Sequence, residues 1–139
     1  MMTIDANALV KLVIDEDQSE EVRRIVYETL SKDEPIISPN IALYESMNVL
    51  WDYSVKKKKL NSDKVLLAFD RLSQIWRQIK HVDSEDLHKI SMTIALDSRL
   101  TAYDSLYVAT SILYKSPLLT FDKEILSKAN GIGITLVKH

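Results

Sequence analysis

Short apolar runs alternate along the chain with longer segments in which apolar residues recur at spacings of three and four. The short runs predict five β-strands, at residues 1–4, 36–37, 79–82, 118–121 and 134–137. The longer segments have the period of an amphipathic helix, as in Val22, Ile25, Val26 and Leu30. Short buried strands separated by helices are typical of a parallel sheet covered on both faces. We therefore predict a three-layer α/β/α fold.

Two consecutive helical segments in the middle of the chain have no predicted strand between them. The first runs from Pro39 through Trp51 to the lysine run 56–59, and the second continues from residue 61 to Trp76. Because no strand returns the chain to the sheet at this point, the pair is expected to project as a helical hairpin. The lysine run at its tip is interpreted either as a solvated end or as a lip that contacts phosphates.

The composition restricts the class of protein. A chain of 139 residues is predicted to form a single domain over residues 1–139. The chain has no cysteine, which excludes disulfides, thiolate metal sites and cysteine catalysis. No apolar run is long enough to span a bilayer and the N-terminus has no signal pattern, so we expect a cytoplasmic protein.

The formal net charge is −2, which argues against a broad basic surface for nucleic acid. It leaves a nuclease possible, because acidic side chains that hold metal ions lower the formal charge while the ions reverse it locally.

Four carboxylates occupy informative positions. Asp5 and Asp122 each follow a predicted strand, and the carboxyl ends of parallel strands form the edge where ligands bind. Glu45 and Asp104 lie on predicted helices, with mostly apolar neighbours three and four residues away. No Arg or Lys lies at helical spacing to Glu45 or Asp104, so an inward-facing carboxylate there needs a cation.

A divalent cation would make such a cluster tolerable. Buried carboxylates that repel one another have raised pKa values, and a bound hard cation removes this penalty. Carboxylates suit Mg²⁺ or Mn²⁺ rather than zinc or copper. Such a site supports phosphodiester hydrolysis, with either one or two metal ions.

Each acid also has a purely structural interpretation. Asp5 would cap the helix that follows it, Asp104 would interact with a helix dipole, and Asp122 would be a turn residue. Glu45 would extend toward solvent or pair with a distant Arg. The three histidines do not pair at metal-ligand spacing, and there is no G-x-S-x-G motif or Gly-rich phosphate loop.

Four motifs in order resemble a known family. They are D-A-N from Asp5, P-x-I-x-x-x-E ending at Glu45, T-A-Y-D-S-L-Y-V-A-T around Asp104, and L-L-T-F-D-K-E-I around Asp122. This set is similar to the PIN domain, and most closely to VapC-type toxins of toxin–antitoxin pairs.

The resemblance implies a fold, a site and partners. The fold is a parallel five-stranded sheet of order 3-2-1-4-5 between helices. Asp5, Glu45, Asp104 and Asp122 would be the metal-binding acids of a Mg²⁺- or Mn²⁺-dependent endoribonuclease. Asn7 would orient Asp5 or a metal-bound water, and Thr120 would do the same beside Asp122. The resemblance also implies a homodimer and a VapB-like antitoxin.

Two other functions remain open from the sequence. A PIN fold can act as a non-catalytic module that binds RNA or protein. A phosphotransfer domain of the haloacid-dehalogenase or receiver type also places an Asp after the first strand, but a dehalogenase needs a second Asp where Asn7 stands. Among the aromatic residues, Tyr103 beside Asp104 is the candidate for base stacking. The RNA target is not specified by any motif.

Overall fold

The computed structural model describes all residues from 1 to 139. Its sheet is parallel and has four strands in the order β3-β2-β1-β4. The strands are β1 (Met2–Ile4), β2 (Ile36–Pro39), β3 (Lys80–Val82) and β4 (Leu118–Leu119). The helices are α1 (Ala6–Val13), α2 (Ser19–Ser31), α3 (Ile41–Val55), α4 (Ser62–Trp76), α5 (Glu85–Ser98), α6 (Ala102–Tyr114) and α7 (Lys123–Ile132). The predicted α/β class with a parallel sheet is confirmed.

The expected fifth strand is not formed. The segment 134–137 lies beside β4, where order 3-2-1-4-5 would place it, but it makes only one parallel bridge, between Leu136 and Leu118. Leu118 donates to the carbonyl of Thr135 at 2.9 Å and accepts from Val137 at 3.0 Å. β4 offers little more to pair with, because it is two residues long before the chain turns toward α7. The sheet therefore ends at β4, and the five-stranded prediction is corrected to four.

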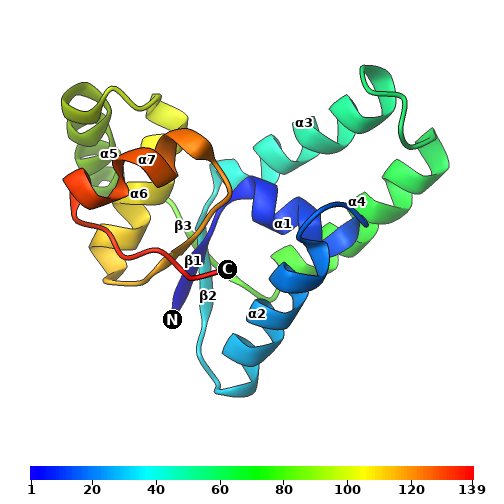
Figure 1. Ribbon diagram of the computed structural model, residues 1–139, viewed down its shortest axis with the longest axis horizontal. Coiled ribbons are helices and arrows are strands. Elements are labelled where there is room, and N and C mark those ends of the chain that lie inside the picture. The colour runs from blue at the N-terminus through cyan, green and yellow to red at the C-terminus, as the bar shows by residue number, and fades with distance from the viewer.

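Helices cover both faces of the sheet (Figure 1). α5, α6 and α7 lie on one side, and α1, α2 and α4 lie on the other. Side chains alternate between faces along a strand, so neighbouring residues of β2 enter different clusters: Ile36 joins the main core, whereas Ile37 packs with Leu87 of α5 and Ala109 of α6. Strands β1, β2 and β4 are buried on both faces, as is typical of a parallel sheet, whereas the edge strand β3 exposes Lys80 and His81. No helix combines the length and apolar character needed to cross a membrane.

The two helices without an intervening strand form a projecting hairpin, as the sequence indicated (Figure 1). α4 begins at Asn61, whose side chain accepts from the backbone N–H of Lys64 at 2.9 Å and caps the helix. The hairpin is anchored at its base by Leu72, which is fully buried in the main core.

Leu72→Ala is expected to lower the free energy of unfolding by about 2–5 kcal/mol, because it leaves a cavity where α4 meets the core. Leu67 of the same helix is half exposed, so Leu67→Ala should change the stability much less. Urea denaturation of both variants would test the difference. Equal losses would mean that Leu72 does not anchor the hairpin.

Candidate active site

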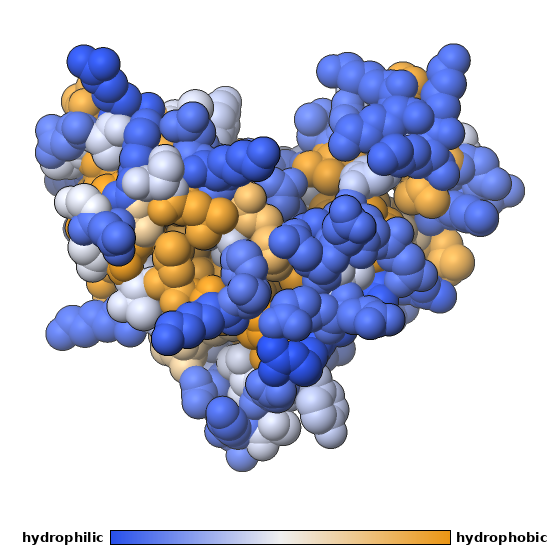
Figure 2. Space-filling view, in the orientation of Figure 1, coloured by the Kyte–Doolittle hydropathy of each residue, from blue (hydrophilic) through white to orange (hydrophobic).

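One cleft at the carboxyl ends of the strands brings together the four acids identified in the sequence. It lies where α1, α3, α6 and α7 begin, and the molecule is indented between the hairpin and the side formed by α5, α6 and α7 (Figure 2). The cleft is lined by Asp5, Ala6, Asn7, Tyr44, Glu45, Asn48, Val49, Tyr103, Asp104, Tyr107 and Asp122. Residues more than one hundred positions apart thus share one site.

Asp5 lies at the floor of the cleft and is almost fully buried, with 3% of its surface exposed. It is the N-cap of α1, and its Oδ1 accepts from the backbone N–H of Ala8 at 2.9 Å. Burial raises the pKa of Asp5 to about 6, and repulsion from Asp122 and Glu45 adds to this. Hydrogen bonds from Thr120 and Ala8 offset part of the rise in pKa. The capping interpretation of Asp5 is therefore correct, and it does not remove Asp5 from the cluster.

Asp122, like Asp5, both lines the cleft and caps a helix. It caps α7, where its Oδ1 accepts from the backbone N–H of Ile125 at 3.0 Å. Its own backbone N–H donates to the hydroxyl of Thr120 at 3.0 Å. Thr120 is buried and contacts both Asp5 and Asp122, and its supporting role stays a prediction.

Glu45 and Asp104 line the cleft from two different helices, α3 and α6. Glu45 is half-buried on α3, and its Oε1 accepts from the hydroxyl of Tyr107 at 2.5 Å. Burial raises the pKa of Glu45, the bond from Tyr107 opposes that rise, and the charges of Asp104 and Asp122 add to it. The pKa of Asp104 is also raised, first by burial and then by the charge of Asp122. The charge of Asp122 therefore raises the pKa of both Glu45 and Asp104.

No protein cation neutralises this group. The ion pairs of the structure involve other acids, and Lys128, the nearest cation to affect Asp104, pairs with Glu124 at 3.3 Å. An unpaired set of carboxylate oxygens is the donor chemistry that a hard divalent cation prefers. The residues thus fit such an ion chemically, although no three of them lie close enough together to enclose one as the structure stands.

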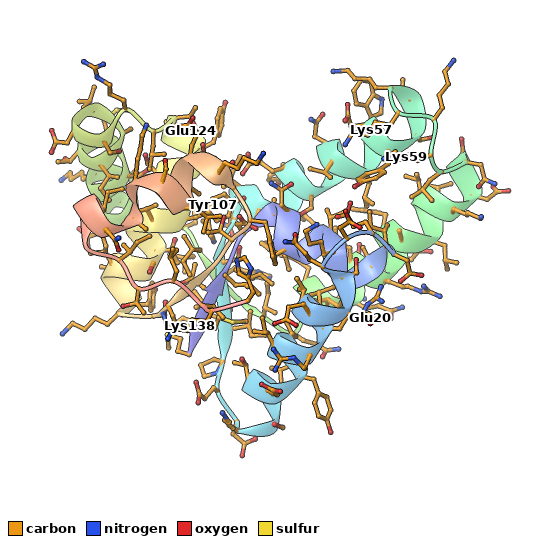
Figure 3. The ribbon with its side chains drawn as sticks, viewed as in Figure 1. Glu20, Lys57, Lys59, Tyr107, Glu124 and Lys138 are labelled. Carbon is orange, nitrogen blue, oxygen red and sulfur yellow. The ribbon has the colours of Figure 1, made fainter.

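Tyr107 is the residue of the cleft that the sequence did not single out. Its side chain is 3% exposed and lies in the middle of the molecule (Figure 3). It sits three residues after Asp104 on α6, a spacing that places both on one helix face and was the available signal. Burial raises the pKa of Tyr107 and the nearby charges of Glu45 and Asp5 raise it further, so its hydroxyl stays protonated and donates.

Two other candidate residues, Asn7 and Tyr103, also line the cleft. Asn7 lines the cleft but is exposed and makes no hydrogen bond to Asp5, so its orienting role stays a prediction. Tyr103 also lines the cleft and is 59% exposed, as a base-stacking residue needs to be.

The lysine run lies away from the cleft. Lys57 and Lys59 are at the outer end of the hairpin, far from Tyr107 (Figure 3). The ammonium groups of Lys56 and Lys57, just past the end of α3, each lie 3.8 Å from a carboxylate oxygen of Asp52 on that helix.

Comparison with known proteins identifies a family and a group of similar folds. The model of the PIN domain family matches residues 2–131. Ribonuclease VapC3 of Pyrobaculum aerophilum is 27% identical over 127 residues, which cover 91% of this chain and 93% of that protein. The crystal structure of PAE2754 from Pyrobaculum aerophilum is 25% identical, with a TM-score of 0.66 over 91% of this chain and 83% of that chain. A toxin–antitoxin complex from Klebsiella pneumoniae is 17% identical, with a TM-score of 0.63 over 90% of each chain.

Proposed function

Because this chain belongs to the PIN domain family, we propose that it is a metal-dependent endoribonuclease that hydrolyses RNA phosphodiester bonds. The observation that carries the proposal is the gathering of four carboxylates from four different elements in one cleft without a protein cation. The name of its relative Ribonuclease VapC3 supports RNA as the substrate. We propose that residues 1–139 act as one nuclease domain.

Asp5, Glu45, Asp104 and Asp122 would hold Mg²⁺ or Mn²⁺ in this cleft. When bound, such an ion lowers the pKa of a water molecule and stabilises negative charge on the phosphate. The chain itself supplies the oxygen donors: Asp5 and Asp122 are held as the caps of α1 and α7, and Glu45 accepts a hydrogen bond from the hydroxyl of Tyr107. The exposed ring of Tyr103 at the rim would stack on a base next to the bond that is cleaved.

We further propose that the chain is the toxin of a VapBC-like toxin–antitoxin pair. The fold likeness to the Klebsiella pneumoniae toxin–antitoxin complex and the name VapC of the relative support this assignment. A VapB-like antitoxin would then be its partner, and the toxin would be a homodimer. Co-expression with the product of a neighbouring small gene, followed by purification through a tag on one chain, would test the pairing.

Mn²⁺ is expected to raise the thermal midpoint of the protein. An ion that binds only the folded state stabilises it by about 2.7 kcal/mol at one hundred times its dissociation constant. Thermal melts in MnCl₂, with NaCl at matched ionic strength as the control, measure this effect. RNA cleavage should appear with Mn²⁺ and disappear with EDTA.

The same experiment separates the enzyme from a non-catalytic PIN module. A module without a metal site would show no Mn²⁺-specific rise in the midpoint and no cleavage of RNA. That pair of results would reject the proposed function.

A further inference from the structure

The hydroxyl of Tyr107 joins two helices that line the cleft. It donates to Oε1 of Glu45, and the two residues are 62 positions apart and on different helices. The hydrogen bonds that Asp5 and Asp122 accept from Ala8 and Ile125 are local, because each runs to the backbone of the acid's own helix. The position of Glu45 therefore depends on another element of the fold.

We propose that Tyr107 is a positioning residue that holds the carboxylate of Glu45 in the cleft, ready to bind the metal ion. The inference rests on the proposed function for the identity of the ion. It goes beyond that function by assigning a role to a residue outside the acidic set.

The ring of Tyr107 is suited to this role because it is anchored. It belongs to the main core, and α6 sets its backbone. The hydroxyl at its end lies beside the charges of Glu45 and Asp5. A buried aromatic side chain is a stiff support, so its hydroxyl is presented at a fixed point.

Glu45 needs such a support more than the other acids do. Its side chain is long and flexible, it is half-buried, and it caps no helix. Freezing a long carboxylate in one conformation costs rotamer entropy. The bond to Oε1 fixes that conformation before an ion arrives and leaves Oε2 without a protein partner.

Tyr107→Phe tests the inference because it removes the hydroxyl and keeps the ring in the core. We expect the dissociation constant for Mn²⁺, measured by isothermal titration calorimetry, to rise about tenfold or more, the usual scale for losing a residue that supports a metal ligand. Tyr114→Phe is the matched control: Tyr114 ends the same helix outside the cleft, so Mn²⁺ affinity should not change.

A double-mutant cycle distinguishes positioning from a general structural effect. If Tyr107 acts through Glu45, then Tyr107→Phe should cause no further loss of Mn²⁺ affinity in a Glu45→Ala background. An equal loss in both backgrounds, or wild-type affinity of Tyr107→Phe alone, would overturn the inference.

A metal-free measurement separates this inference from the proposed function. Crystal structures of the wild type and of Tyr107→Phe without metal should differ in the conformation of Glu45. If the wild type did not bind Mn²⁺, the proposed function would fail, but a displaced Glu45 in the variant would still support positioning. An unchanged Glu45 would overturn it.

Discussion

Asp5→Asn is expected to lower Mn²⁺-dependent RNA cleavage by roughly 10²- to 10³-fold, the scale for removing one group that stabilises charge in a transition state. Asn can still accept the hydrogen bond from the Ala8 N–H, so the cap of α1 is kept. What is lost is a negative oxygen donor at the floor of the cleft. A fluorogenic RNA substrate and a matched melting curve would measure both effects.

The control for this variant is Asp70→Asn. Asp70 is exposed on α4 and lies outside the cleft, so the substitution makes the same change in charge without touching the site. Cleavage should be retained in Asp70→Asn. Wild-type cleavage by Asp5→Asn would show that the assignment of the site is wrong.

The second large effect concerns pH and stability in the absence of metal. The pKa of Asp5 is about 6 in the folded protein, against an ordinary value of 3.8. Between these values the folded state binds more protons than the unfolded state, so stability falls as the pH rises. The shift corresponds to about 3 kcal/mol for this buried group. Asp5 therefore contributes a loss of about that size between pH 4 and pH 7, which urea denaturation can follow.

Asp5→Asn isolates this contribution, because Asn does not titrate. The stability of the variant relative to wild type should increase across the same pH range, and its melting temperature without metal at pH 7 should equal or exceed that of wild type. At pH 7, saturating Mn²⁺ should raise the stability of the wild type but not that of the variant. A constant difference between the two proteins at all pH values would contradict the raised pKa of Asp5.

The sequence predicted the parts of the site that depend on strand ends and helix faces. Asp5 and Asp122 could be placed because each directly follows a buried apolar run, and a parallel sheet brings such positions to one edge. Glu45 and Asp104 could be placed because their neighbours on the helix are apolar. The convergence of all four in one cleft follows from the strand order, which the family resemblance supplied.

Other features depend on contacts that a sequence pattern does not encode. The segment 134–137 has the composition of a strand, but its pairing is limited by the short β4, whose length is set by the turn that places Asp122. The bond between Tyr107 and Glu45 joins two helices whose relative placement is tertiary. Spacing could put Tyr107 on the face of Asp104, but it could not show which carboxylate its hydroxyl would reach.

Asp5 and Asp122 each cap a helix as well as line the cleft, and this affects how an inactive paralogue would be recognised. Both side chains cap a helix, so selection for folding alone would keep a capping residue at each position after catalysis was lost, and Asn would serve there as well as Asp. Glu45 caps no helix, and its one hydrogen bond is to the hydroxyl of Tyr107 on another helix. A capping residue at position 5 or 122 is therefore weak evidence that a related copy is active. Loss of the acid at position 45 is not opposed by a capping role, so it is the more informative change.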